Sequence, residues 1–350
     1  MKILHIISSL EIGGAQRLLS EILPLMAKAH DVTLLVNKEV ENDFSCKIKE
    51  AGVKIINCGC SNLHSPQNII RIAKVAKGYG VVHVHLFPTV YWAAFASLLS
   101  SLNLVYSEHS TSNRRRGKWY FKPIEKFVYS RYRKVISISQ QTKEALTMWL
   151  GTKDGDPRFV VINNGVNLSS FQNMKAEKLY PYTLVMVSRF VESKDQMTVI
   201  RAMKLLPENV HVIFVGDGEN LDSCKGLTSK EGLSERVHFV GKQSNVASWI
   251  AQADIGVQSS NWEGFGLTAV ELMAAGKPVV ATNVDGLKQV VEGAGILFPV
   301  GDDVALAKAV KELIDSPDYY KQVSERCKEQ SLKYDINCTA IKYLEVYRQL

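Results

Sequence analysis

The sequence lacks several patterns that would assign it to other classes of protein. Its six cysteines are scattered and none belongs to a Cys-x-x-Cys pair, so in a chain of this size we expect reduced, mostly buried thiols and a cytoplasmic protein. It contains no short internal repeat and no low-complexity tract. No Gly-x-Gly-x-x-Gly follows the first apolar run, which argues against a nicotinamide dehydrogenase.

Long apolar runs that would indicate export or membrane insertion are also missing. The opening run is interrupted by His5, ends at Glu11 and has no small-residue cleavage site, unlike a signal peptide. The uncharged stretch 86–107 is long enough to span a bilayer, but it contains Pro88, Asn103 and several serines. We expect the first run to be a buried strand, and the second a buried helix followed by a strand.

What the sequence does contain is a regular alternation of short apolar runs and helical patterns. Its 350 residues, 46% hydrophobic and 22% charged, suit a soluble globular protein of two domains. Continuous apolar strands between helices predict parallel sheets covered on both faces, hence an α/β fold of two doubly wound domains. Because the pattern restarts near residue 181 after a polar segment, we expect a linker around 168–180 and domains at 1–172 and 173–334. The predicted strands are 2–7, 31–36, 54–57, 81–86, 104–108, 134–139, 183–189, 210–218, 236–241, 254–259, 278–282 and 295–298.

Positive charge is concentrated in the first half of the chain. Residues 1–170 hold 22 lysines and arginines against 12 acidic residues, whereas residues 171–350 hold 20 against 23. The segment 111–134 carries nine basic residues and one acid, interleaved with six aromatic side chains. This composition suits an anionic membrane surface. Nucleic acid would use the same chemistry, and a solvated basic helix face is the alternative without a ligand. We expect the membrane and no nucleic acid.

Ligands of open parallel sheets bind beyond the carboxyl ends of the strands, so the loops there are the candidate sites. Gly13 and Gly14 follow the first strand and open a helix, where backbone N–H groups attract phosphate. Arg189 and Lys194 follow the first strand of the second half; they suit phosphate oxygens but also an ordinary helix start. A further glycine turn follows a strand in IFVGDGEN, residues 213–220.

Two carboxylates eight residues apart flank another glycine turn in NWEGFGLTAVELMAAGKPVVAT, residues 261–282. Thr268 and Glu271 fit a capping box, which gives Glu271 a structural explanation. Glu263, beside Gly264-Phe265-Gly266, gains nothing obvious from the fold. We therefore expect Glu263 to serve a ligand.

At these residues the chain resembles the retaining glycosyltransferases of the GT-B fold, specifically family 4. The segment from Glu263 resembles the E-x7-E segment of that family, and NNGVN (163–167) resembles its NGVD stretch. Arg189 with Lys194 resembles the family's phosphate clamp, and the glycine loop at Gly13 its N-terminal loop. The resemblance spans nearly the whole chain. It implies two Rossmann-like domains facing across a cleft, with a C-terminal helix at about 335–350 crossing back to the first domain.

The resemblance also implies roles for individual residues. Arg189 and Lys194 would bind the diphosphate and stabilise the charge on the leaving nucleotide, and Glu263 would bind the sugar hydroxyls. Glu271 would accept the ribose hydroxyls. Backbone groups would complete the donor site. The implied catalytic residues are Glu263, Arg189, Lys194 and His109, and the implied substrate-binding residues are Gly14, Gln243, Gly264, Phe265, Gly266, Leu267 and Glu271.

Metal and cofactor are not expected, because the two cations supply the positive charge. His83 and His85 alternate on one strand without convincing companions as ligands, so we expect them to be structural. The single Asp-x-Asp, Asp154-Gly155-Asp156, lies in a turn before a strand. No enzymic nucleophile is placed for a double displacement, so the resemblance implies front-face transfer with retention.

The expected function is transfer of a hexose-type sugar from a nucleotide diphosphate-sugar, with UDP favoured over GDP. The acceptor would be a lipid-linked saccharide or oligosaccharide of a surface polysaccharide (capsule, O-antigen or exopolysaccharide), at the inner face of the cytoplasmic membrane. The alternatives are an epimerase or phosphorylase of the same fold and a non-catalytic sugar-nucleotide-binding protein. The chain departs from the family pattern at 285–289, which borders the sugar, so the identity of the sugar stays open.

Overall fold

The computed structural model divides the chain into two compact units, each an α/β domain built on one parallel sheet. The expected fold of two doubly wound domains is therefore confirmed. Unit 1 comprises Met1–Gly165 with Ile336–Leu350, and unit 2 comprises Val166–Asp335. The boundary predicted from the sequence, 172/173, lies a few residues further along the chain. The described residues are 1–11, 13–59, 62–111, 115–153, 155–172, 174 and 176–350.

Unit 1 is built on a seven-stranded sheet with the order β3-β2-β1-β4-β5-β6-β7, parallel throughout. Helices cover both of its faces, so interior residues of its central strands are buried on both sides, which explains their continuous apolar runs. The strands are β1 (Lys2–Ser9), β2 (Asp31–Lys38), β3 (Lys54–Asn57), β4 (Val81–His85), β5 (Leu104–Glu108), β6 (Lys134–Ser137) and β7 (Phe159–Val161).

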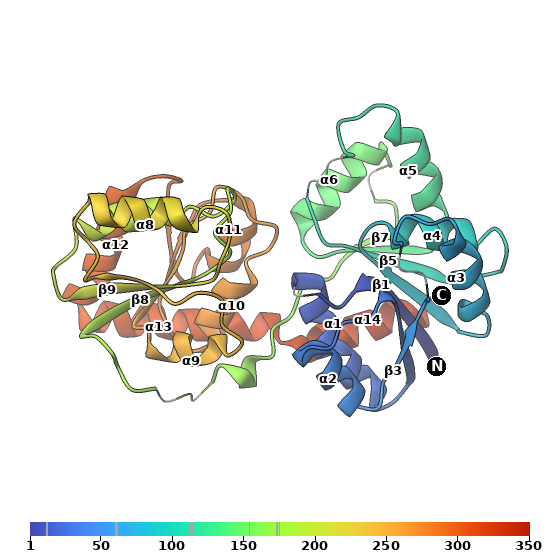
Figure 1. Ribbon diagram of the computed structural model, residues 1–350, viewed down its shortest axis with the longest axis horizontal. Coiled ribbons are helices and arrows are strands. Elements are labelled where there is room, and N and C mark those ends of the chain that lie inside the picture. Colours follow the sequence, from blue (N-terminus) through green and yellow to red (C-terminus); the bar gives the residue numbers. More distant parts are fainter. Residues whose placement is uncertain (12, 60–61, 112–114, 154, 173, 175) are drawn as a thin grey trace. The chain divides into compact units, whose positions relative to one another are not determined.

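The helices of unit 1 form two layers, each packed on a separate hydrophobic cluster (Figure 1). One layer contains α1, α2 and α14, and the other contains α3 to α6. Local capping is clear in α6, where the Ser139 side chain accepts from the Thr142 N–H and Gly151 ends the helix in the left-handed region. The helices are α1 (Gly14–Ala27), α2 (Asp43–Glu50), α3 (Gln67–Ala76), α4 (Thr89–Ala96), α5 (Phe121–Ser130), α6 (Gln140–Leu150) and α14 (Ile336–Arg348).

The last helix, α14, returns to unit 1 and packs beside α1 (Figure 1). Tyr343 and Tyr347 are buried in the same cluster as the core of α1. Where α14 starts, Gly165 lies so close that an added Cβ would sit 2.6 Å from the Ile336 Cα. The expected crossover of the C-terminal helix onto the first domain is confirmed.

Unit 2 repeats the arrangement with a six-stranded parallel sheet in the order β10-β9-β8-β11-β12-β13. Side chains of its helices cap their own ends: Asp195 accepts from the Thr198 N–H, and Asp302 from the Ala305 N–H. The strands are β8 (Tyr182–Val187), β9 (Val210–Val215), β10 (Val237–Phe239), β11 (Ile255–Gln258), β12 (Val279–Thr282) and β13 (Ile296–Phe298). The helices are η1 (Leu168–Ser170), α7 (Gln196–Met203), α8 (Leu221–Lys230), α9 (Val246–Gln252), α10 (Leu267–Ala274), α11 (Asp285–Val291), α12 (Asp303–Asp315), α13 (Pro317–Ser331) and η2 (Leu332–Tyr334).

All twelve predicted strands are present, and one strand was missed. β7 has only three residues, two of them half-buried, so its pattern is too short to stand out from a loop. The stretch 86–107 contains α4 and the start of β5, as expected. Among the helices of the described ranges, every one is too short or too polar to cross a bilayer.

Candidate active site

The candidate donor site lies at the carboxyl ends of β8 and β11 in unit 2. β8 has β9 on one side and β11 on the other, so connections leave it in opposite directions, which is where open parallel sheets bind ligands. Arg189 and Lys194 follow β8, and Glu263 and Glu271 follow β11. The strand order thus brings together the two loops that the sequence analysis had selected.

The loop after β8 is held by the glycine turn after β9. Gly216 has a φ of +148°, and a Cβ there would lie 1.9 Å from the Ser188 carbonyl oxygen, so only glycine allows this approach. The Phe190 N–H donates to the Asp217 carbonyl at 3.0 Å. Arg189 lies between these contacts and its side chain is exposed. The glycines of this turn therefore support the backbone that carries Arg189.

Lys194 and Glu263 form an ion pair between the two loops, with side-chain exposures of 17% and 20%. Lys194 Nζ also donates to Ser260 Oγ at 3.4 Å. Backbone bonds join the same loops, from Asn261 N–H to the Ser193 carbonyl at 3.0 Å. The statement that Glu263 gains nothing from the fold is wrong, because Glu263 neutralises a half-buried lysine. No sequence pattern shows this pair, since its residues come from different loops.

The glycine turn after Glu263 is shaped by close packing against the start of α11. Gly266 is the N-cap of α10 with a φ of +93°, a conformation that favours glycine. A Cβ on Gly286 would lie 2.3 Å from the Glu263 carbonyl oxygen, so glycine at position 286 allows the first turn of α11 to touch the Glu263 loop. Phe265 is buried and its ring packs edge-on against Tyr334 at 5.5 Å. The sequence analysis did not recognise the need for glycine at Gly286.

The predicted capping box at Thr268 and Glu271 is wrong. The helix α10 begins at Leu267, so Thr268 is its second residue, and no side chain caps Gly266. Glu271 lies in the second turn and is 1% exposed. A carboxylate is rarely buried to this degree, and a cap does not explain it here.

Gln243 follows β10, the edge strand of the same sheet, which β9 separates from β8. Its side-chain amide donates to the Val240 carbonyl at 2.6 Å, and the preceding Gly241 has a φ of +70°. The amide is therefore used to close the turn. Because the side-chain amide of Gln243 is engaged in this bond, a ligand would meet the backbone of the turn.

Unit 1 places its two predicted site residues at the carboxyl ends of β1 and β5. Gly14 is the first residue of α1, and none of the described residues places an atom within 4 Å of a Cβ added there. His109 directly follows β5 and is half-buried. Burial lowers the pKa of His109 to about 4, so the imidazole is neutral at pH 7. The helix end at Gly14 is open to an approaching anion.

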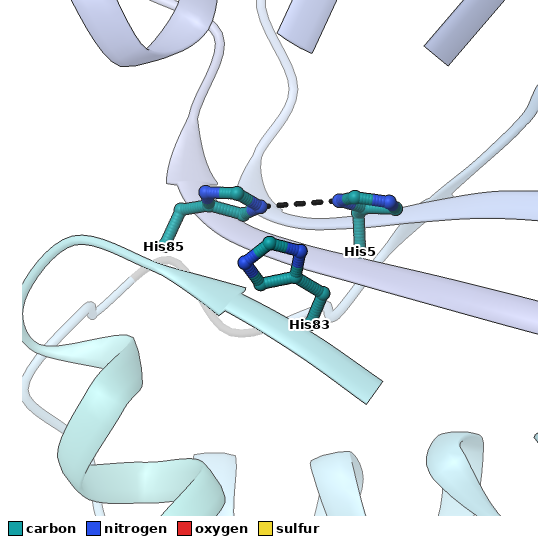
Figure 2. Close-up of side chains that lie close together, drawn as sticks. All are labelled: His5, His83 and His85. Atoms are coloured by element: carbon teal, nitrogen blue, oxygen red, sulfur yellow. Dashed lines mark hydrogen bonds between the residues drawn. The ribbon is translucent and has the colours of Figure 1, made fainter. Parts of the chain in front are cut away.

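Beside His109, three buried histidines lie together on the face of the sheet under α14 (Figure 2). His83 and His85 come from β4, and His5 comes from the neighbouring β1, where it is aligned with His83. The statement that His83 and His85 lack companions is wrong, because His5 joins them. The three histidines are visible in the sequence, two at alternate positions of β4 and one in β1. Recognising them as a cluster requires knowing that β1 and β4 are neighbours.

Much of the basic-aromatic segment 111–134 serves the fold of unit 1. Arg116 pairs with Glu108 at 2.7 Å, and Arg115 pairs with Glu125 at 2.9 Å. Tyr129 is buried. Residues 112–114 lie outside the described residues. The exposed residues of the segment include Lys118, Trp119, Tyr120, Pro123, Ile124, Lys126, Phe127 and Arg133.

The single Asp-x-Asp gives no metal site on the described residues. Asp154 lies outside them, and Asp156 pairs with Arg158 at 2.7 Å. A hollow of unit 1 lies next to this turn, lined by residues of α5, the end of α6 and the start of β7. It contains none of the predicted site residues, so we do not connect it with donor binding.

Comparisons with known proteins agree with this arrangement. Residues 12–170 match the family described as Glycosyltransferase Family 4, and residues 170–330 match Glycosyl transferases group 1. The uncharacterized glycosyltransferase MJ1178 of Methanocaldococcus jannaschii is 30% identical over 285 residues, which cover 79% of this chain and 77% of that protein. The chain belongs to the glycosyltransferases.

Two further proteins are similar to this glycosyltransferase, one in sequence and one in structure. Lipopolysaccharide core biosynthesis glycosyltransferase LpsD of Rhizobium meliloti is 34% identical over 145 residues, 41% of this chain and 42% of that protein. The match therefore spans less than half of LpsD. Anabaena Alr3699/HepE, solved in complex with UDP and glucose, is 21% identical with a TM-score of 0.85, and all of both chains is covered. This likeness confirms the GT-B fold.

Proposed function

We propose that this glycosyltransferase is retaining and transfers a hexose-type sugar from a nucleotide diphosphate-sugar, UDP being preferred to GDP. One observation carries the proposal: two cations, two carboxylates and a glycine turn gather at the switch point of the unit 2 sheet. A further support is that Anabaena HepE, which has the same fold, was solved with UDP and with UDP-glucose. The acceptor we propose is a hydroxyl of a lipid-linked saccharide or oligosaccharide in the synthesis of a surface polysaccharide. LpsD, by its name, acts in lipopolysaccharide core synthesis.

The diphosphate is proposed to bind Arg189 and Lys194. Arg189 is exposed at the end of β8 and presents a planar fork suited to phosphate oxygens. Lys194 is paired with Glu263, so its charge is balanced before the donor arrives. An arriving diphosphate competes for Lys194 and leaves Glu263 to accept hydrogen bonds from the sugar hydroxyls. Both cations then stabilise the charge that develops on the leaving phosphate.

Backbone groups and a buried carboxylate complete the proposed donor site. N–H groups of Phe265, Gly266 and Leu267 lie at the start of α10, where the helix end favours negative charge. The Gly264 N–H donates to Glu263 Oε1 at 3.0 Å and helps to hold that carboxylate. Glu271 is proposed to accept the two ribose hydroxyls. The turn at Gln243 is proposed to meet the base through its backbone, because its side-chain amide is already engaged.

Unit 1 is proposed to present the acceptor and to complete the reaction. Gly14 leaves open space at the start of α1 for the diphosphate, and His109 contacts the transferred sugar. We place no residue as an enzymic nucleophile. The leaving phosphate itself accepts the acceptor's proton on the face from which it departs, which gives retention. Because Arg189 and Lys194 supply the positive charge, we propose that the reaction needs no metal or other cofactor.

The donor is tested by thermal shift with UDP, GDP, ADP and their sugars. UDP at one hundred times its Kd stabilises the native state by about 2.7 kcal/mol, which raises the melting temperature by several degrees. Arg189→Ala and Lys194→Ala are expected to lose most of this shift. Lys204→Ala is the matched control, because Lys204 forms an exposed pair with Glu231 in the same unit. Equal shifts in all three variants would remove the proposed clamp.

Turnover and stereochemistry are tested next with the nucleotide-sugar that gives the largest shift. We expect transfer to a lipid-linked saccharide, with the anomeric configuration of the donor preserved in the product by proton NMR. An inverted product would contradict the retaining mechanism. Activity that disappears with EDTA and returns with Mg²⁺ or Mn²⁺ would contradict metal independence. Release of an epimerised sugar or a sugar phosphate would favour the alternatives.

We further propose that unit 1 attaches to the anionic inner face of the cytoplasmic membrane through α5 and the turn before it. Trp119 is 82% exposed, and Tyr120, Ile124 and Phe127 are exposed around it. Lys118 and Lys126 are exposed in the same stretch. Aromatic side chains beside lysines suit the interface of an anionic bilayer. The cations already paired inside unit 1 do not contribute to this surface.

Membrane attachment is tested by flotation with vesicles of neutral lipid alone and with added phosphatidylglycerol. The wild-type chain is expected to float with the anionic vesicles, less so at high salt. Trp119→Ser is expected to reduce recovery. Val304→Ser is the matched control, because Val304 is 64% exposed on α12 of unit 2. Equal recovery on both kinds of vesicle would contradict the proposal.

A further inference from the structure

A row of neutral imidazoles runs through the interior of unit 1 to His109. His5, His83 and His85 are each 0% exposed. They face the α14 side of the sheet, where they lie against one another, against the rings of Tyr343 and Tyr347, and against His109. Burial lowers the pKa of His5 to about 3 and places those of His83 and His85 well below their usual value. The rings are therefore uncharged at pH 7, and each carries a single N–H proton.

Three of these rings form one chain of hydrogen bonds. His109 Nε2 lies 3.2 Å from His85 Nδ1, and His85 Nε2 lies 3.1 Å from His5 Nδ1 (Figure 2 shows the second bond). His85 therefore uses both of its ring nitrogens. The chain ends at His5 Nε2, which is buried and has no hydrogen-bond partner among the described residues.

His83 belongs to a separate set of bonds. Its Nδ1 lies 2.5 Å from the Tyr347 hydroxyl, and its Nε2 lies 2.8 Å from Ser107 Oγ. The ring nitrogens of His5, His83 and His85 are close enough together to suggest a zinc site. However, a metal would have to break one of the two hydrogen bonds of His85 and take a nitrogen that His83 already uses. The hydrogen-bonded chain explains the geometry without a metal.

The N–H groups of the hydrogen-bonded series His109–His85–His5 can all donate in one of two directions, and the burial of His5 Nε2 decides between them. If each ring donates toward His5, the His5 Nε2 carries an N–H with no acceptor in the interior. If each ring donates toward His109, the His5 Nε2 keeps only an unshared lone pair. An orphaned buried N–H is rarer in proteins than an under-used acceptor. The second direction is therefore favoured: His5 donates to His85, and His85 donates from Nδ1 to His109 Nε2.

We propose that His85, with His5 behind it, is a positioning residue that holds the single ring proton of His109 on Nδ1. The Nε2 lone pair of His109 is then occupied by the His85 N–H. His109 can donate a hydrogen bond from Nδ1 but has no free basic nitrogen. Among the described residues no hydrogen bond reaches His109 Nδ1. Resting on the proposed function, this makes His109 a donor to an oxygen of the bound sugar or phosphate, and not a general base.

The proposal is tested by the ¹⁵N–¹H long-range NMR spectrum of the imidazoles in the full chain, with ¹⁵N-labelled histidine. His109 is assigned by its loss in His109→Asn. Protonated and bare ring nitrogens differ widely in ¹⁵N shift, so each tautomer is read directly. We expect the proton of His109 on Nδ1 in the wild type at pH 7. A proton on Nε2 overturns the proposal whether or not any variant folds.

Two variants of His85 separate positioning from a purely structural role. His85→Phe removes the donor, and we expect at least half of His109 to move to the Nε2–H form. His85→Asn keeps an amide N–H near the same position and is expected to restore the Nδ1–H form. His238→Phe is the matched control, because His238 forms an imidazole pair with His211 in unit 2. An unchanged His109 tautomer in folded His85→Phe overturns the proposal.

The third test is a zinc titration followed by the same imidazole spectrum. After EDTA treatment, one equivalent of ZnCl₂ is expected to leave the resonances of His5, His83 and His85 unchanged. A joint shift of all three at one equivalent overturns the proposal, because the metal would take the nitrogens that carry the chain. The spectrum needs no nucleotide-sugar. A wrong donor assignment therefore leaves this result intact, and a wrong tautomer leaves the donor assignment intact.

Discussion

The two units of this glycosyltransferase share one strand order, apart from the additional β7 of unit 1, but they carry different chemistry toward the carboxyl ends of their strands. In unit 2 the loops after β8 and β11 carry an exposed arginine and the pair of Lys194 with Glu263. In unit 1, neutral imidazoles extend from His5, in the middle of β1, to half-buried His109, directly after β5, at the carboxyl-end edge. The comparison teaches that the fold supplies the position of a site, while the residues at the strand ends decide its chemistry.

The difference also concerns how each edge is kept stable. Unit 2 keeps Arg189, Lys194 and Glu263 at least partly exposed, so that water offsets the cost of desolvation, as does the partner of opposite sign for Lys194 and Glu263. Unit 1 leaves its buried imidazoles uncharged, which avoids that cost. Its buried carboxylates, Glu108 and Glu125, are instead paired with Arg116 and Arg115. A charged edge suits a diphosphate, and a neutral edge suits the hydroxyls of a saccharide.

The largest expected effect is on the charged edge. Glu263→Gln keeps the shape of the side chain but removes its negative charge, which we propose accepts hydrogen bonds from the sugar hydroxyls. We expect kcat to fall by about 10²-fold or more, with the Kd for UDP changed only a few-fold. Glu292→Gln is the control, because Glu292 is 64% exposed and belongs to a surface pair in the same unit. Turnover of Glu263→Gln within two-fold of wild type would mean that the two edges do not differ as described.

An intermediate effect is expected from the packing that shapes the charged edge. Gly286→Ala places a Cβ 2.3 Å from the Glu263 carbonyl oxygen, whereas Gly264→Ala meets nothing within 4 Å. We expect Gly286→Ala to destabilise unit 2 by about 1–3 kcal/mol and Gly264→Ala to stay within about 0.5 kcal/mol. Urea unfolding measures both. Equal losses in the two variants would show that close approach at Gly286 is not what positions Glu263.

The smallest effect, and the one specific to unit 1, concerns pH. The folded-state pKa of His5 is about 3, below the unfolded value of 6.5, so the unfolded state binds more protons between these values. Stability from this group is therefore present above pH 6.5 and is lost as the pH falls toward 3, by at most about 1.4 kcal/mol per pH unit. Urea unfolding from pH 7 to 5 should show this loss in wild type. It should be reduced in His5→Phe; an identical slope in both would contradict the neutral edge.

The sequence predicted the α/β architecture well because its signals are local. Apolar runs of β-branched residues gave every long strand, and only the three-residue β7 escaped. The motif residues Arg189, Lys194 and Glu263 were also visible, since each lies directly after a predicted strand. The structure adds that these motifs belong to neighbouring strands, β8 and β11.

What the sequence could not show depends on contacts between distant segments. The ion pair of Lys194 with Glu263 joins residues 69 positions apart, and the bond of His5 with His85 joins residues 80 apart. The capping box at Thr268 failed for another reason: Gly266, in a left-handed conformation, already starts the helix. Sequence spacing matched a known motif there, but the backbone used a different one.

The central claim, that the charged edge of unit 2 holds the nucleotide diphosphate-sugar, is tested most directly by hydrogen–deuterium exchange of the full chain with and without saturating UDP. We predict slower exchange in the peptides that cover residues 188–194 and 261–271. Unchanged exchange in both of those segments while UDP is demonstrably bound would contradict the claim.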